Sequence, residues 1–204
     1  TTIKFAPGRM LVIEGTLVAD GTSDSPIAFT SAADDPQPGD WGGYFAPFGT
    51  AGIMFTESSS PAVLDSYRQY VSGCVIRNAT VQYGRGVASI GGAPLIEQSR
   101  ITYNLGYGLR TERAWVAALD GQAPVVRANH ITDNIGAGVQ LHKSGTEVLG
   151  NVITRNSRGA VVAHEPGRVI ANLITGNAAA DCVGAAGGAA GPYAAIRLQD
   201  GIWR

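Results

Sequence analysis

The stretch Asn129-His130-Ile131-Thr132-Asp133-Asn134-Ile135-Gly136-Ala137-Gly138-Val139 decides the fold of this 204-residue chain. It begins with the pattern Asn-x-Ile-Thr-x-Asn, in which two amides flank a β-branched residue, and two glycines follow. The pattern belongs to a longer template, Val/Ile-x-x-Asn/Ser-x-Ile-Thr-x-Asn. Four copies of this template occupy residues 96–104, 126–134, 148–156 and 169–177.

The spacing of the copies indicates stacked coils. Their central isoleucines, at 101, 131, 153 and 174, follow one another at intervals of 30, 22 and 21 residues, and a weaker copy places Val81 at the same site. Self-similarity at such a period is typical of a solenoid, in which each coil buries its apolar face against neighbours about 4.8 Å away. We therefore predict an all-β, single-domain parallel β-helix over residues 1–204, with coils of about 20–22 residues.

Stacking in register should align equivalent residues in columns. Two inward columns are expected, one of Val81, Ile101, Ile131, Ile153 and Ile174, the other of Ile96, Val126, Val148 and Val169. Thr102, Thr132, Thr154 and Thr175 should form an outward hydroxyl ladder. The asparagine that ends each copy should adopt the left-handed conformation of a tight bend and bond to its equivalent in the next coil. The alternative, a solenoid of short helices, conflicts with this density of Gly and Asn.

With these motifs, the chain resembles the right-handed parallel β-helix repeat proteins of the pectate-lyase-like superfamily. Residues 13–22, residues 26–31 and Gly39-Asp40-Trp41-Gly42-Gly43 resemble the first coils of many secreted or surface members. The resemblance implies an extracellular or cell-surface location and, with the handedness rule for parallel crossovers, a right-handed coil. It implies little about activity, because the fold hosts lyases, hydrolases, epimerases, adhesins and fibres.

Three regions depart from the template. Residues 46–72 are expected to leave the coil as an irregular excursion, and residues 111–122, with Trp115, to form the side insertion that lengthens one interval to 30 residues. Such insertions often make the binding face of a solenoid. Residues 178–204 form an Ala/Gly-rich terminal region. No amphipathic capping helix is visible, so self-association through the solenoid ends or sides is expected.

Composition narrows the partners. A net charge of −1 and a charged fraction of 15% argue against nucleic-acid binding, which needs a basic face. The apolar stretches are shorter than the roughly 18 residues of a membrane span, so no membrane insertion is expected. The two cysteines, Cys74 and Cys182, lie about five coils apart, on the order of 24 Å. They are too distant for a disulfide and are interpreted as small buried apolar residues.

Catalytic residues are hard to assign. The resemblance implies either clustered carboxylates that bind calcium with an Arg or Lys base, as in the lyases, or three close Asp residues, as in the hydrolases. Neither arrangement is recoverable from the sequence. Weak candidates are Asp133 and Arg155, which should share one column, and His130, which should lie beside Arg100. The simpler interpretation is an exposed ion pair between coils, worth less than about 1 kcal/mol.

A metal candidate and an aromatic candidate remain. Asp34, Asp35 and Asp40 lie in one loop and could collect oxygen ligands around calcium, although the intervening prolines also fit a solvated turn. The aromatic candidate is a strip suited to sugar rings, or else to packing beneath the insertion. It consists of Tyr83, Tyr103, Tyr107 and Trp115.

These observations favour a secreted or cell-surface structural or assembly β-helix protein that contacts polysaccharide. Calcium is the one cofactor considered, and the interpretation leans away from an enzyme. The alternative is a polysaccharide lyase or glycoside hydrolase that acts on acidic polysaccharide.

Overall fold

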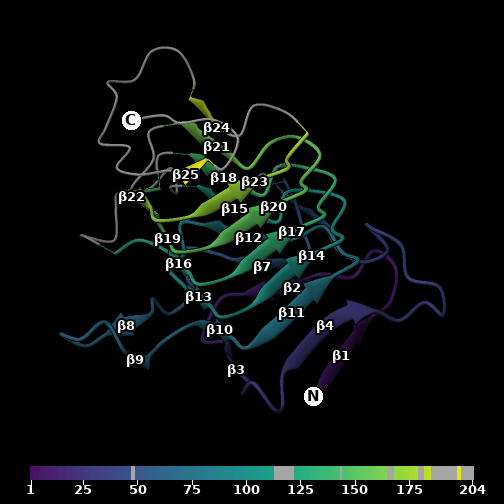
Figure 1. Cartoon of the computed structure of the whole chain (residues 1–204). Coiled ribbons are helices and arrows are strands. Elements are labelled where there is room, and N and C mark those ends of the chain that lie inside the picture. Colours follow the sequence, from purple (N-terminus) through teal and green to yellow (C-terminus); the bar gives the residue numbers. More distant parts are fainter. Residues whose placement is uncertain are drawn as a thin grey trace.

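The computed structural model describes residues 1–46, 49–112, 122–142, 144–164, 168–178, 182–184 and 197–198. These residues form three long parallel β-sheets, which we name sheets A, B and C, and two small hairpins (Figure 1). No helix, and hence none able to cross a membrane, occurs in these ranges. The described chain is therefore all-β.

The three sheets differ in the strands that they contain, which follow in spatial order. Sheet A contains β1 (Thr2–Phe5), β4 (Ile27–Ser31), β11 (Ala79–Gln82), β14 (Arg100–Thr102), β17 (His130–Thr132), β20 (Val152–Thr154), β23 (Leu173–Thr175) and β25 (Arg197–Leu198). Sheet B contains β2 (Leu11–Ile13), β7 (Ile53–Phe55), β12 (Val87–Ile90), β15 (Leu109–Glu112), β18 (Val139–His142), β21 (Val161–His164) and β24 (Cys182–Gly184). Sheet C contains β22 (Arg168–Ile170), β19 (Glu147–Leu149), β16 (Val125–Arg127), β13 (Leu95–Glu97), β10 (Val75–Arg77) and β3 (Val18–Asp20).

The chain visits the sheets in the same order in every coil, from A to B to C. After β14, β15 and β16, for example, the chain returns to sheet A as β17, which pairs with β14 in parallel. Each strand thus pairs with its equivalent in the next coil, and Figure 1 shows the strands of each sheet stacked along one axis. This confirms the parallel β-helix.

The predicted inward columns are confirmed. Val81 pairs with Ile101, Ile101 with Ile131, and the column continues through Ile153 to Ile174, all with 0% exposure. The second column runs from Ile96 to Val169 and also includes Ile76. Sheet B adds a third column that the template did not contain. It consists of Leu11, Ile53, Val87, Leu109, Val139 and Val161.

The predicted role of the asparagines at the bend between sheets A and B was partly wrong. The left-handed residue is the one before each asparagine: Tyr83, Tyr103, Asp133 and Arg155 have φ of 62°, 53°, 58° and 54°. The asparagines point inward instead. Asn134, for example, is fully buried, and its amide bonds to Asn104 and Asn156 in the neighbouring coils. A buried amide must be hydrogen-bonded, and the stacked coils supply its partners.

The threonine ladder is in register but covered. Thr102, Thr132 and Thr154 are only 1%, 6% and 9% exposed, so the expected solvent-facing ladder was wrong. Short side chains that repeat at the strand spacing of about 4.8 Å cover one another. Thr154 Oγ1 donates to Thr132 Oγ1 at 3.1 Å.

The excursion expected over residues 46–72 is also corrected, because β7 within it is a regular strand of sheet B. All three residues of β7 are buried, since the β5–β6 hairpin (Gly43–Phe45 and Gly49–Ala51) covers its outer face. That burial removes the alternation that would have marked a strand. The true excursion in this region is the β8–β9 hairpin (Val63–Leu64 and Tyr70–Ser72), which packs on the outer face of sheet C and projects from the body in Figure 1.

The side insertion begins one strand end later than predicted. Thr111 is a buried residue of β15, and the extra residues lie between Glu112 and Val125. Residues 113–121, with Trp115, are outside the described ranges, as is most of the terminal region 178–204.

Cys74 is a free, fully buried cysteine, as expected. Burial raises the pKa of its thiol. The side chain of Cys182 lies outside the described part of the chain.

Candidate functional site

The bend between sheets C and A shapes the surface on which we place the candidate site. One residue in each coil takes a positive φ at this bend and turns the chain by a tight corner. These residues are Asn78, Gln98, Ala128, Gly150 and Ala171, with φ of 47°, 51°, 54°, 61° and 56°. Because they are stacked coil on coil, they form a straight column along the axis of the helix.

A second polar ladder holds this corner from inside. Asn129 donates its backbone N–H and its side-chain amide to Oδ1 of Asn151, both at 2.9 Å, and Asn151 bonds to Asn172 in the same way. In the earlier coil Ser99 takes the place of asparagine, and its hydroxyl accepts from Ala79 N at 3.1 Å. The ladder fixes each corner relative to the next.

Outside the corner, three adjoining depressions follow the column. They share lining residues, since Asn78 lies in two of them, Ala128 in two and Gln98 in all three. We call their union the corner furrow. Its lining comprises Asp20, Gly21, Thr22, Ser23, Pro26, Gln69, Arg77, Asn78, Ala79, Thr80, Glu97, Gln98, Ser99, Arg100, Arg127, Ala128, His130, Leu149 and Gly150.

The charges on the sheet C side of the furrow neutralise one another. Arg77 donates to Asp20 Oδ1 at 2.6 Å and to Glu97 Oε1 at 3.2 Å, and Arg127 donates to Glu97 Oε2 at 2.6 Å. The hydrogen bond from Arg77 lowers the pKa of Asp20, and Asp20 raises the pKa of Arg77 in return. Both carboxylates and both guanidinium groups are thus paired.

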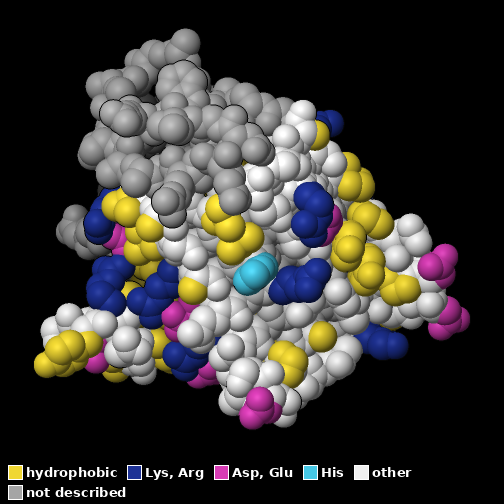
Figure 2. All heavy atoms as spheres, viewed as in Figure 1, with side chains coloured by type: hydrophobic (Ala, Val, Ile, Leu, Met, Phe, Trp, Pro, Cys, Tyr) yellow, Lys and Arg dark blue, Asp and Glu magenta, His cyan; other side chains and the backbone are white. Residues whose placement is uncertain are grey.

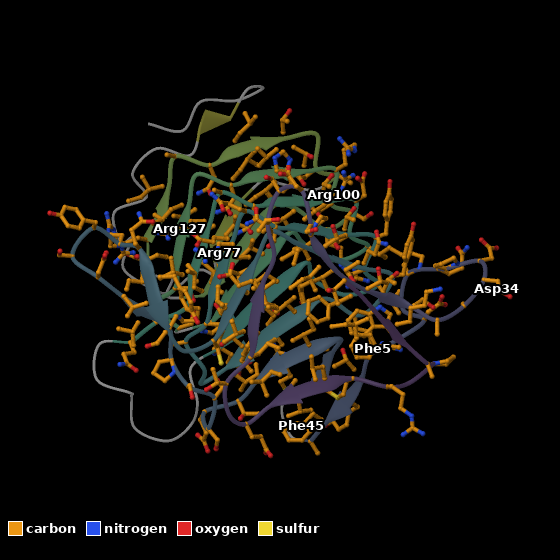
Figure 3. All side chains as sticks on the ribbon, turned by 90° about the horizontal axis from the view of Figure 1, so that it is seen from below. Phe5, Asp34, Phe45, Arg77, Arg100 and Arg127 are labelled. Carbon is orange, nitrogen blue, oxygen red and sulfur yellow. The ribbon has the colours of Figure 1, made fainter. Side chains whose placement is uncertain are left out.

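The β8–β9 hairpin forms a wall on this side. Arg127 Nη1 donates to the backbone oxygen of Arg68 at 2.7 Å, and Arg68 pairs with Glu147. The guanidinium of Arg77 lies 5.5 Å from the ring centre of Tyr70. The arginines of the sheet C side therefore also hold the hairpin in place, and Figure 3 shows Arg77 and Arg127 close together, apart from Arg100.

The sheet A side carries cations without such partners. Arg100 and His130 are exposed, begin the paired strands β14 and β17, and lie directly opposite each other in the register. Neither forms an ion pair with another residue of the described ranges. Figure 2 looks onto this face and shows a histidine near its centre with basic side chains beside it.

The structure divides the candidate catalytic residues. Asp133 and Arg155 are brought together, because Arg155 Nε and Nη2 donate to Oδ1 and Oδ2 of Asp133 at 2.7 and 2.8 Å. The pair lowers the pKa of Asp133 and raises that of Arg155. It lies at the bend between sheets A and B, whereas His130 lines the corner furrow. Asp133 and Arg155 thus form an exposed ion pair between coils, and His130 belongs to another surface.

The aromatic candidates form a stack. The rings of Tyr83 and Tyr103 lie 5.7 Å apart between centroids and 8° from parallel. That separation is too short for two rings side by side in one plane, so their faces overlap. Each ring then keeps one face free for a ligand, which is less area than a flat strip would offer. Tyr107 is half-buried in the loop before β15, and Trp115 is outside the described ranges.

The acidic loop is built around Asp40. Its Oδ2 accepts from the hydroxyl of Ser31 and from the backbone N–H of Gln37, both at 2.9 Å. Asp34 and Asp35 are exposed. Within the described ranges, no three His, Cys, Asp or Glu side chains gather in a group that could hold a metal ion.

Sequence reasoning missed most of the furrow. Thr22, Ser23, Asn78 and Gln98 belong to three different coils and meet only when the coils stack. A signal was present, because Gln98, Ala128 and Ala171 occupy one site in three template copies, directly before the Ser or Asn of the inner ladder. Knowledge that this site is the left-handed one would have pointed to an outer corner.

Comparison with known proteins agrees with the fold. No curated protein and no solved structure matches the chain. Residues 45–179 match a family model described as a right handed beta helix region. That match spans more than half of the chain and includes the stacked coils on either side of the corner furrow. The chain therefore belongs to the right-handed β-helix family.

Proposed function

We propose that this chain is an extracellular or cell-surface β-helix module that holds an extended polysaccharide along the corner furrow. The observation that carries the proposal is the continuity of the furrow across successive coils. Its lining runs from Thr22 through Asn78, Gln98 and Ala128 to Gly150, one corner per coil. Five corners at about 4.8 Å each extend over roughly 20 Å, which suits a polymer better than a single sugar.

The chemistry of the lining supports a sugar ligand. The hydroxyls of Thr22, Ser23 and Thr80 and the amides of Asn78 and Gln98 can both donate and accept hydrogen bonds. Sugar hydroxyls also do both, so the two sets are complementary. The inner ladder keeps these groups at a fixed spacing, which lowers the entropy lost on binding.

A polysaccharide panel tests the proposal. Wild type and the variant Ala128→Trp are compared by affinity electrophoresis in gels that contain neutral or acidic polysaccharides. Ala128 is exposed in the furrow, so a Trp side chain should fill the furrow and reduce retardation by any polymer that wild type binds. Ala171→Trp is the matched control, because Ala171 is also exposed and left-handed on the same column but lies beyond the furrow lining. Equal binding by all three proteins, or no binding by wild type, would contradict the proposal.

The alternative of a lyase or hydrolase is tested on the same samples. The observation in its favour is that Arg100 and His130, both able to take part in proton transfer or charge stabilisation, line the furrow where the polymer would lie. New unsaturated products would indicate a lyase and new reducing ends a hydrolase. Polymers that are bound but unchanged would favour a non-catalytic module.

The structural role and self-association stay part of the proposal. Strand β1 is at the edge of sheet A and, among the described strands, pairs only with β4. An unpaired strand edge can add a strand from another molecule. Sedimentation velocity over a wide concentration range tests this, and a constant monomer mass at all concentrations would rule it out.

A further inference from the structure

We infer that the polymer is anionic, and that Arg100 and His130 bind its carboxylate or sulfate groups on the sheet A side of the corner furrow. The inference rests on the proposed function and adds the class of ligand and the residues that select it.

The first argument is the difference in charge between the two sides of the furrow. On the sheet C side, Arg77 and Arg127 are satisfied by Asp20 and Glu97, and Glu97 is only 5% exposed. An anion there would have to break these pairs. On the sheet A side, the exposed Arg100 and His130 have no ion-pair partner in the described part of the chain. An anion can therefore approach them without displacing a protein carboxylate.

The second argument is their spacing. Arg100 and His130 are directly opposite on adjacent parallel strands, which lie about 4.8 Å apart. Both side chains can therefore reach one anionic group, with the planar guanidinium donating two parallel hydrogen bonds to it. Thr80, opposite Arg100 in the coil before, adds a hydroxyl to the same column.

The third argument is the limited extent of this polar segment. In the same column the next residue on one side is Ala28 and on the other Val152. Thr80, Arg100 and His130 thus form a short polar segment between apolar neighbours, as a binding subsite requires. The net charge of the chain is only −1, so attraction of a polyanion must come from such a local group rather than from the whole protein.

The test uses pairs of polymers that differ in charge but share a backbone. Binding of the full chain is measured with polygalacturonate and its methyl ester, and with dextran sulfate and dextran. The first pair probes carboxylates and the second sulfates. The expected result is binding of at least one charged polymer that is about tenfold tighter than binding of its neutral counterpart, because charge-assisted hydrogen bonds are involved.

Variants then locate the contact. Arg100→Gln and His130→Gln should each weaken binding of the charged polymer, Arg100→Gln by about tenfold. Arg158→Gln is the matched control, because Arg158 is an exposed arginine that does not line the furrow. Circular dichroism and the melting temperature establish that each variant is folded.

Two outcomes would overturn the inference while leaving the proposed function intact. One is equal binding of charged and neutral polymers, with both lost in Ala128→Trp. The other is equal weakening by Arg158→Gln and Arg100→Gln, which would indicate diffuse attraction. If wild type binds none of the four polymers and none of the wider panel, the proposed function itself fails and the inference with it.

Discussion

Asn104 donates both its backbone N–H and its side-chain amide to a single atom, Oδ1 of Asn134, at 3.1 and 3.0 Å. Asn134 repeats this arrangement with Asn156, and its own amide also donates to the carbonyls of Ile101 and Thr132. One buried side chain therefore satisfies backbone groups of its own coil and of a neighbouring coil. The ladder replaces the water that would otherwise solvate these bends.

The first prediction concerns this ladder. Asn134→Ala removes the acceptor of the buried Asn104 N–H and the donor to two carbonyls, so it should lower the free energy of unfolding by about 3 kcal/mol or more. Chemical denaturation measures the change. Ser157→Ala, at an exposed position of the same bend, should change it little. A loss at Asn134 no larger than that at Ser157 would contradict this role.

The second prediction compares two glycines that both have positive φ. A Cβ on Gly86 would lie 1.9 Å from the backbone oxygen of Tyr107, whereas a Cβ on Gly150 would meet nothing within 4 Å. Gly150→Ala should cost about 1 kcal/mol, from left-handed strain alone. Gly86→Ala adds a clash with a neighbouring coil and should cost several times more. Equal melting temperatures for the two variants would show that the coils are not stacked this closely.

The sequence was sufficient to predict the fold because stacking in register makes each column a repeated chemical environment. The column from Val81 to Ile174 was predicted residue by residue, since an inward site surrounded by identical neighbours accepts only a narrow range of side chains. The strand β7 was missed for the opposite reason. Its outer face is covered by the β5–β6 hairpin, so Met54 is buried where an exposed strand would carry a polar residue.

The candidate site was harder to predict than the fold. Spacing placed His130 beside Arg100 and Asp133 beside Arg155, and both pairings are confirmed. Spacing could not tell which of two adjacent residues takes the left-handed conformation, because Tyr103 and Asn104 both occur at such bends. That single-residue difference decides which side chains point inward, and with it where the outer corners and the furrow lie.

The third prediction concerns the buried hydroxyl of Thr102. Its Oγ1 has no hydrogen-bond partner among the described residues, and the side chain is 1% exposed. Thr102→Val should therefore raise the free energy of unfolding by about 1 kcal/mol, because an unsatisfied polar atom is replaced by a methyl group of similar shape. Thr132→Val is the comparison, since Thr132 Oγ1 accepts from Thr154 and donates to Asp133. It should be destabilising, and stabilisation by both changes would contradict the argument.

The fourth prediction concerns the pH dependence of stability at the Asp133–Arg155 pair. The hydrogen bonds from Arg155 hold the pKa of Asp133 below its ordinary value of 3.8 in the folded state. The folded state therefore favours the carboxylate, so the pair stabilises the protein above the unfolded pKa of about 3.9 and this contribution is lost as the pH falls through the lower, folded pKa. Because the side chain of Arg155 is 61% exposed, the effect should stay below about 1 kcal/mol.

Asp133→Asn tests this dependence directly. The variant should be less stable than wild type at pH 7, and the difference in melting temperature should shrink as the pH is lowered below about 4, because wild type then loses the same ion pair. High salt should also reduce the difference at pH 7 by screening the exposed partner. Asp35→Asn, at an exposed carboxylate that forms no ion pair within the described ranges, is the control and should follow wild type at every pH. A difference between Asp133→Asn and wild type that persists unchanged at acid pH would mean that Asp133 acts through its shape or its neutral hydrogen bonds and not through its charge.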